Sequence, residues 1–224
     1  MRAGEKVREF YEALLAAWGP QGWWPGETPL EVCVGAILTQ NTAWRNVERA
    51  IGNLKAAGAL QVPALWALPE QELAELIRPA GYFNVKAGRL RNFLRLVVEE
   101  YDGSLEQLFE LPTERLRETV LGVRGIGRET ADSMVLYAAG RAVFVVDAYT
   151  LRIAFRHGIV ELDADYETLQ EAFAGAVEKD VAVWQEYHAL LVRAGKMHCK
   201  KQAPVCAGCP LQGFLEEGEP REPF

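Results

Sequence analysis

The stretch that most constrains this chain runs from residue 121 to residue 156, LGVRGIGRETADSMVLYAAGRAVFVVDAYTLRIAFR. It predicts the end of one helix, a tight turn, a second helix, an extended segment and a third helix. In the turn, Gly125 and Gly127 flank one apolar residue, so the backbone can adopt positive φ values and leave N–H groups exposed at the next helix start. The turn is therefore a predicted phosphate-binding site, formed by those N–H groups, the helix dipole and the charges of Arg124 and Arg128.

One carboxylate lies near the end of this stretch. Asp147 follows the apolar run 142–146 and precedes a helix expected over 148–157, so it occupies the N-cap position of that helix. Taken separately, a Gly-x-Gly segment is most often an ordinary turn, and an aspartate before a helix is most often an ordinary cap. The two together, at this spacing and with these flanks, are far more specific than either alone.

The stretch resembles the helix-hairpin-helix and aspartate motif of the endonuclease III superfamily of DNA glycosylases. Residues 125–127, Gly-Ile-Gly, match the hairpin, and residues 145–147, Val-Val-Asp, match the segment that bears the catalytic aspartate. One position departs from the pattern, because bifunctional members carry a Schiff-base lysine where this chain has Glu129. The resemblance therefore implies that Asp147 is catalytic and that, with Glu129 at the lysine position, strand cleavage through a Schiff base is missing.

The same resemblance implies an all-α fold of two helical domains with a DNA cleft between them. A six-helix barrel with the hairpin is expected over residues 29–141, and a second helical domain is expected to join residues 1–28 to 142–224. The periodicity and the proline and glycine breaks predict helices at 3–18, 29–40, 43–57, 69–77, 83–100, 104–110, 113–121, 148–157, 166–178 and 181–195. Residues 142–146 have strand-like propensity but no partner strand, so we expect an extended connection.

Two aromatic segments are candidates for a base-binding pocket. Trp23, Trp24 and Pro25 stand together in a loop, and Trp44 opens a helix. Packing between domains or in the core is the alternative for each segment taken alone. Their joint presence resembles the 3-methyladenine glycosylase branch of the superfamily, in which aromatic side chains from these two segments form the pocket.

Other positions match segments that contact DNA in the family. Gln40, at a helix end, resembles the glutamine that fills the gap left by an extruded base. Residues 81–87, GYFNVKA, resemble the loop that wedges a side chain into the duplex, which makes Tyr82 the wedge and Lys86 a DNA contact. A stacked aromatic side chain contributes roughly 1–3 kcal/mol per base, so tyrosine is chemically suited to this position.

Three cysteines near the C-terminus have the spacing of a metal site. Cys199, Cys206 and Cys209 form a C-x6-C-x2-C pattern. This pattern resembles the first three ligands of the four-cysteine iron–sulfur loop of endonuclease III-like enzymes and implies a [4Fe–4S] cluster. The fourth ligand would fall at Leu215, so water, His198 or a carboxylate of the tail has to complete the cluster. Zinc with three cysteines and His198 is the rival.

The remaining histidines and the charge pattern carry less information. His157, His188 and His198 share no metal-ligand spacing, and core or surface roles are expected for them. The net charge of −7 is a weak argument against a nucleic-acid partner, but residues 84–97 and 193–201 carry basic side chains with no acid among them. No segment is long and apolar enough to span a membrane, and the N-terminus lacks a secretory pattern, so a cytoplasmic protein is expected. Nothing in the sequence indicates an obligate protein partner.

The resemblance implies a chemistry on damaged double-stranded DNA, and the residues are consistent with it. A base must leave the stack before its glycosidic bond can be reached, and breaking that bond builds positive charge on the sugar. The carboxylate of Asp147 can stabilise this charge and orient the attacking water. Without a lysine nucleophile the reaction depends on an activated leaving group, and alkylated purines such as 3-methyladenine carry a positive charge. We therefore expect a monofunctional glycosylase acting on 3-methyladenine-like bases.

Two alternatives stay open on the sequence. The first is a bifunctional glycosylase and lyase acting on oxidised pyrimidines through another lysine. The second is a catalytically weak protein that binds lesions or abasic DNA without cutting, which Glu129 and the missing fourth cysteine both allow.

Overall fold

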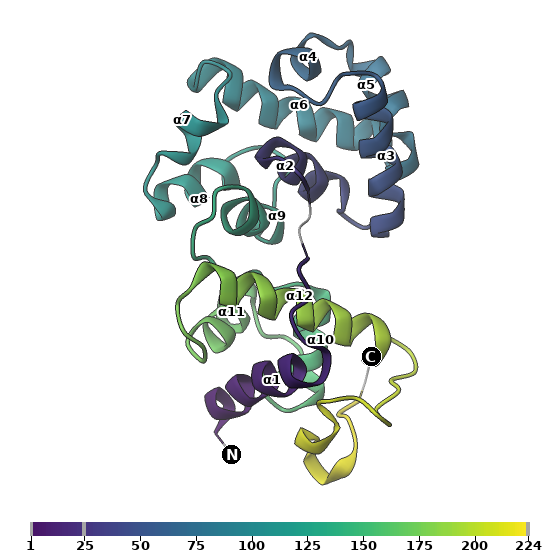
Figure 1. The fold of residues 1–224 in the computed structure, drawn as a ribbon, viewed down its shortest axis with the longest axis vertical. Coiled ribbons are helices and arrows are strands. Elements are labelled where there is room, and N and C mark those ends of the chain that lie inside the picture. Colours follow the sequence, from purple (N-terminus) through teal and green to yellow (C-terminus); the bar gives the residue numbers. More distant parts are fainter. Residues whose placement is uncertain (1, 24–25, 223–224) are drawn as a thin grey trace. The chain divides into compact units, whose positions relative to one another are not determined.

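The computed structural model describes residues 2–23 and 26–222, and the chain divides into two compact units. Residues 24–141 form one unit, called here the hairpin unit, and residues 1–23 with 142–224 form the other, called here the terminal unit. All regular structure among the described residues is helical, so the expected all-α class is confirmed (Figure 1). No helix in this described part has the length and apolarity needed to cross a bilayer.

The hairpin unit is built around α2, Pro29–Leu38, which is buried along nearly its whole length (Figure 1). Thr28 caps α2 by accepting a hydrogen bond from the backbone N–H of Glu31, and Pro29 occupies the first turn, where its missing N–H does no harm. This helix packs against α3, α6, α9 and the π-helical turn η2. The remaining elements of the unit are α3 Trp44–Ala56, α4 Val62–Ala67, α5 Glu70–Leu76, η1 Arg78–Ala80, α6 Phe83–Glu100, α7 Leu105–Phe109, α8 Thr113–Leu121, α9 Arg128–Ser133 and η2 Met134–Ala138.

One lysine links α3 to α2 and to the segment before it. The ammonium of Lys55 in α3 lies 2.9 Å from the carboxylate of Glu27, before α2, and 3.0 Å from that of Glu31, in the first turn of α2. The expected domain bounds, 29–141 for the barrel and 1–28 with 142–224 for the second domain, stay a prediction.

Helix α4 is not among the helices expected from the sequence. Pro63 occupies its first turn, where proline is tolerated. The other helices lie within a few residues of their expected bounds. Residues 142–147 are extended without a partner strand, as expected.

Over its described residues, 2–23 and 142–222, the terminal unit consists of four α-helices and a C-terminal loop. They are α1 Ala3–Trp18, α10 Ala148–Arg156, α11 Tyr166–Ala174 and α12 Val181–Met197, followed by the short turns η3 Gln212–Phe214 and η4 Glu216–Gly218. Helix α12 packs against α10 and α1, and α1 packs against α11. The hydroxyl of Tyr187 in α12 donates to the carbonyl of Val7 in α1 over 2.6 Å, so a fully buried phenol fixes the two helices together.

Candidate functional site

Asp147 is held at the start of α10 by two hydrogen bonds from one residue. Its Oδ1 accepts from the backbone N–H of Thr150 over 2.8 Å and from the Thr150 hydroxyl over 2.9 Å. The side chain is 12% exposed. Burial raises the pKa of this carboxyl, but the interaction with His188 and the bonds from Thr150 outweigh burial and hold the pKa below its ordinary value. The group is therefore an anion at neutral pH in a largely dry environment, which suits electrostatic stabilisation of a cation.

His188 faces the other carboxylate oxygen of Asp147. Its Nε2 lies 3.8 Å from Asp147 Oδ2, and the residue is 5% exposed on α12. The ring of Trp23 lies against it with centroids 5.7 Å apart. Reasoning from the sequence missed this neighbour, because the two residues lie 41 positions apart and no local signal joins them. Only the packing of α10 against α12 brings the imidazole to the carboxylate.

The hairpin between α8 and α9 has the expected form, but its two glycines differ. Gly125 adopts a φ of +97°, and a Cβ there would lie 2.5 Å from Cγ of Arg89. Gly127 is the N-cap of α9 with a φ of −94°, and a Cβ there would meet no atom within 4 Å. The left-handed conformation is therefore needed only at Gly125. The exposed side chains of Arg124 and Arg128 flank the turn, as expected.

The side-chain amide of Gln40 forms hydrogen bonds to the hairpin and does not extend away from it. Its Nε2 donates to the carbonyl of Gly125 over 3.2 Å and to the hydroxyl of Thr130 over 3.0 Å. The guanidinium of Arg89 in turn donates to Gln40 Oε1. The side chain expected to fill the gap left by an extruded base thus holds the hairpin turn in this structure.

The structure places Lys86 inside the hairpin unit and not on a DNA-facing surface. The residue is 1% exposed, and its ammonium donates to the carbonyls of Leu38 and Ala80 over 2.8 Å each. Burial, with a smaller effect of the nearby Arg89, lowers the pKa of Lys86 to about 8. The expectation that Lys86 contacts a DNA phosphate is corrected. Two buried carbonyls accept hydrogen bonds from its ammonium, which therefore links α2 to the turn before α6 and does not reach solvent.

Other basic side chains of residues 84–97 are also used internally. Arg91 donates to the carbonyl of Leu68 over 2.7 Å and stacks on the ring of Trp66. The run of positive charge that the sequence offered as a DNA-binding face is therefore largely part of the helix packing of this unit.

Tyr82 is the most exposed large apolar residue among those described. Its side chain is 74% exposed, and its backbone is left-handed with a φ of +46°. A non-glycine residue in this region is strained by roughly 1–2 kcal/mol. Strain and apolar exposure at one position are typical of a residue kept for binding and not for packing. This geometry is compatible with the expected wedge.

The aromatic pocket residues are divided between the two units. Trp44 opens α3 and is partly exposed, and its indole N–H donates to the carboxylate of Glu48 over 3.0 Å. Trp23 belongs to the terminal unit and lies against His188. Trp24 and Pro25 lie outside the described residues. The shared base pocket stays a prediction. Glu129, at the lysine position of the family pattern, is exposed on α9.

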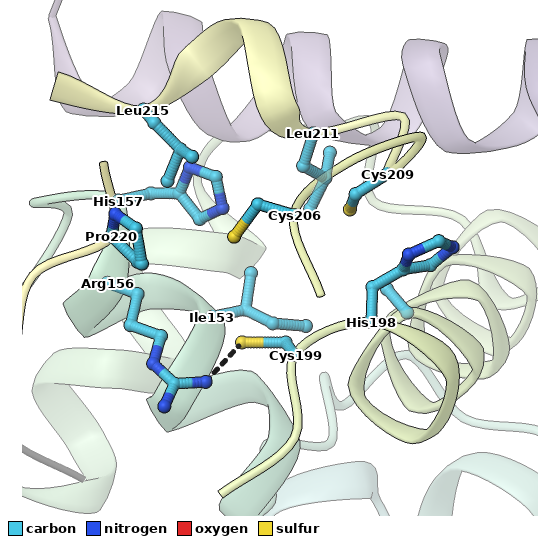
Figure 2. Close-up of a pocket in the computed structure, with 11 residues that line it drawn as sticks. Ile153, Arg156, His157, His198, Cys199, Cys206, Cys209, Leu211, Leu215 and Pro220 are labelled. Carbon is cyan, nitrogen blue, oxygen red and sulfur yellow. Dashed lines mark hydrogen bonds between the residues drawn. The ribbon is translucent and has the colours of Figure 1, made fainter. Parts of the chain in front are cut away.

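The three cysteines of the C-terminal loop line one cavity. Figure 2 shows Cys199, Cys206 and Cys209 around it. The guanidinium of Arg156 donates to the sulfur of Cys199 over 3.3 Å and to the carbonyl of Lys200 over 2.7 Å. All three thiols are free. Within the described ranges, however, no group of three or more His, Cys, Asp or Glu side chains converges on a common metal position.

The environment of these thiols is compatible with a bound cation. Burial raises the pKa of Cys206, and the charges of Cys199 and Glu222 raise it further while the charge of Arg156 lowers it. Burial also raises the pKa of Cys209, with added effects of Cys206 and Cys199 that the backbone of Leu211 partly offsets. Cysteine binds metals as the thiolate, which is a soft sulfur ligand, so the chemistry of these three side chains suits a metal that prefers sulfur.

Two histidines also line this cavity. His198 stacks on Trp18 with centroids 5.9 Å apart, and its Nδ1 lies 3.0 Å from the carbonyl of Val205. His157 is 6% exposed, and burial lowers its pKa to about 4 although the backbone of Phe214 offsets part of the shift. Leu215, at the position of the fourth family cysteine, lines the cavity as well.

Comparison with known proteins identifies relatives along nearly the whole chain. The model of the HhH-GPD superfamily of base excision DNA repair proteins matches residues 34–179. A protein of Methanocaldococcus jannaschii named as a putative DNA repair glycosylase is 46% identical over 212 residues, which cover 94% of this chain and 96% of the relative. Endonuclease III of Bacillus subtilis is 30% identical over 156 residues, covering 70% of this chain and 67% of the relative.

Solved structures of related fold cover the chain to a similar extent. A trapped covalent intermediate of endonuclease III with DNA has a TM-score of 0.83 at 22% identity and covers 97% of this chain and 98% of its own. A 3-methyladenine DNA glycosylase of H. pylori bound to 1,N6-ethenoadenine has a TM-score of 0.74 at 27% identity, covering 88% of this chain and 98% of its own. The fold described above is therefore that of an endonuclease III-like protein.

Proposed function

This chain belongs to the HhH-GPD superfamily of base excision DNA repair proteins, and we propose that it is a monofunctional DNA glycosylase that excises alkylated, 3-methyladenine-like bases from double-stranded DNA. The observation that carries the proposal is the largely buried carboxylate of Asp147 at the start of α10, held by two hydrogen bonds from Thr150 and facing His188. Its position in the sequence matches the catalytic aspartate of the family pattern, and its environment keeps it charged at neutral pH.

Asp147 acts on the sugar of the flipped nucleotide. As the glycosidic bond breaks, positive charge grows on the sugar, and a carboxylate fixed nearby lowers the energy of that state. Oδ1 is occupied by two bonds from Thr150, so the carboxylate cannot rotate freely. Oδ2, which lies 3.8 Å from Nε2 of His188, is the oxygen that we expect to face the reacting centre and to orient water.

A lyase step needs an amine nucleophile, and the residues argue against one. Glu129 stands at the lysine position and offers a carboxylate. Lys86 has the lowered pKa that a nucleophilic lysine requires, but its ammonium is buried and bonded to two carbonyls. We infer that the product is an intact abasic site.

The preference for alkylated bases rests on the aromatic side chains. Trp44 is partly exposed at the start of α3 and can stack on a cationic purine. Such a cation–π contact contributes about 0.5–2 kcal/mol. Trp23 is the candidate from the other unit. The likeness to the H. pylori 3-methyladenine glycosylase points in the same direction.

We propose that Cys199, Cys206 and Cys209 hold a [4Fe–4S] cluster. The three free thiols around one cavity, with the guanidinium of Arg156 against one sulfur, are the donor set for it. When bound, the cluster cross-links the loop and gives it a fixed shape. Its exposed neighbours Lys196, Lys200 and Lys201 can then meet DNA phosphates. Zinc is the rival metal, and bound iron with absorption near 400 nm separates the two.

The likeness to endonuclease III favours a second candidate function, a bifunctional glycosylase and lyase. Borohydride trapping on abasic DNA distinguishes it, because only a Schiff base is reduced to a permanent link. We expect no trapped product. A strong band of protein covalently trapped on DNA would contradict the monofunctional assignment and support the bifunctional one.

The direct test of the proposal is base release from methylated duplex DNA. We expect free 3-methyladenine in the supernatant and strand breaks that appear only after alkali treatment. Breaks without alkali would indicate a lyase. Binding to abasic DNA without any release would indicate a lesion-binding protein.

A substitution of Tyr82 can separate the backbone strain at this residue from its contribution to DNA binding. Replacing it with glycine removes the strained left-handed tyrosine, so we expect the free energy of unfolding to rise by about 1 kcal/mol. We also expect duplex affinity to fall by the stacking contribution of roughly 1–3 kcal/mol. Chemical denaturation and a fluorescence binding titration measure the two quantities.

Asp102→Gly is the matched control for Tyr82→Gly. Asp102 has a φ of +51° in the same unit, so its replacement should relieve similar strain. It should leave affinity unchanged. An equal loss of affinity in both variants would contradict the wedge.

A further inference from the structure

The cysteine loop lacks its fourth family ligand, and the structure shows what lies at that place. Leu215 occupies the position and cannot bind iron. Figure 2 shows the ring of His157 beside Leu215 and Cys206, at the rim of the same cavity. A ligand for the unmatched iron has to come from a side chain that reaches this corner.

The turn after α10 and the segment around residue 215 are packed tightly together. A Cβ on Gly158 would lie 2.6 Å from the carboxylate of Glu216. The ring of Phe10 contacts both His157, at 4.9 Å between centroids, and Phe214, at 5.2 Å. The ammonium of Lys6 donates a hydrogen bond to the backbone carbonyl of His157 over 2.7 Å. His157 is thus fixed next to the position where the family pattern has cysteine.

The imidazole of His157 is buried with an unused ring nitrogen. The residue is 6% exposed, and its Nδ1 has no hydrogen-bond partner in the described part of the chain. Leaving such an atom unpaired in the interior is unfavourable, because its hydrogen bond to water is lost and not replaced, so it requires an explanation. The backbone of Phe214 beside the ring is the kind of neighbour that orients a metal-binding imidazole.

His198, the ligand that the sequence suggested, is already engaged. Its ring stacks on Trp18, and its Nδ1 interacts with the carbonyl of Val205. The side chain is also partly exposed and lies on the Cys209 side of the cavity, away from Leu215 (Figure 2). It is therefore the natural control residue.

We propose that His157 replaces the fourth cysteine and, with Cys199, Cys206 and Cys209, completes the ligand set of the iron–sulfur cluster. This inference rests on the cluster assigned above, but not on the base that the protein excises. The proposal predicts that one iron of the cluster differs from the other three, because the imidazole of His157 is neutral and is a harder ligand than a cysteine thiolate.

The test uses the full-length protein with its cluster, isolated without oxygen and labelled with ¹⁵N-histidine. In the paramagnetic state of the cluster, reached by reduction or oxidation, we expect electron–nuclear double resonance to detect a directly bound histidine nitrogen in wild type. His157→Ala should lose that coupling and release iron to a chelator about tenfold faster or more. His198→Ala should keep the coupling and the wild-type rate of iron release.

Two rescue variants keep the test decisive if His157→Ala folds poorly. His157→Cys should retain the iron and show no nitrogen coupling. Leu215→Cys, introduced into His157→Ala, should restore slow iron release because the thiol stands at the adjacent position. Full iron loading without nitrogen coupling in wild type, or coupling that survives His157→Ala, would overturn the ligand assignment. Stoichiometric zinc without iron would overturn the cluster itself, and neither result depends on glycosylase activity.

Discussion

Replacing Asp147 with asparagine is expected to reduce base release by about 10²- to 10⁴-fold while leaving the protein folded. Asparagine is as good an N-cap as aspartate, so the bonds from Thr150 to Oδ1 can be kept. What is removed is the negative charge that stabilises the cationic sugar. Single-turnover release of 3-methyladenine from methylated DNA measures the effect, and thermal unfolding checks the fold.

Asp180→Asn is the matched control for this variant. Asp180 caps α12 in the same unit, where it accepts from the backbone N–H of Val183 over 2.9 Å, but it is exposed. Its charge should not matter for catalysis. If Asp147→Asn released bases at the wild-type rate, or if both variants lost activity equally, the catalytic assignment would fail.

The pH dependence of base release follows from the same environment. The pKa of Asp147 lies below the ordinary 3.8, so the carboxylate stays charged as the pH falls from 7 to that value. Its contribution to stability is present above the unfolded-state pKa and is lost only as the pH falls through the lower folded-state pKa. An acid limb of activity attributable to Asp147 is therefore expected only below pH 3.8.

Replacing Gly125 with valine is expected to produce the largest loss of DNA affinity among the hairpin variants. A Cβ at this position would lie 2.5 Å from Cγ of Arg89, and the φ of +97° is closed to a β-branched residue. The turn has to change shape, which also breaks the bond from Gln40 to the Gly125 carbonyl. We expect affinity for abasic duplex to fall by about tenfold or more and the free energy of unfolding to fall by at least about 1–2 kcal/mol.

Two further glycines separate the causes of that effect. Gly103→Ala imposes left-handed strain at a φ of +77° away from the hairpin, so stability should fall and affinity should not. A Cβ at Gly127 would meet no protein atom within 4 Å, and the φ is ordinary. Gly127→Val should therefore lower stability less than Gly125→Val, through the weaker N-cap alone, while affinity falls because the side chain obstructs the approach of a phosphate. Normal affinity in both Gly125→Val and Gly127→Val would contradict the hairpin as a DNA contact.

Local signals in the sequence determined most of the helices. α1, α6 and α8 have the expected bounds because apolar periodicity and the proline and glycine breaks act within a few positions of one another. The same holds for the N-cap position of Asp147, which an apolar extended run and a following helix define. The all-α class and the family pattern of glycines, aspartate and cysteines were likewise present in the chain itself.

Tertiary packing decided how the site residues are used. His188 reaches Asp147, Gln40 braces Gly125 and Lys86 is buried between two carbonyls only because helices distant in sequence pack together. A basic or polar residue type does not reveal whether its charge meets solvent or a buried carbonyl, because that depends on which helix face lies opposite. For the same reason, the sequence shows that Leu215 stands where the fourth ligand is missing, but only the fold places His157 beside Leu215.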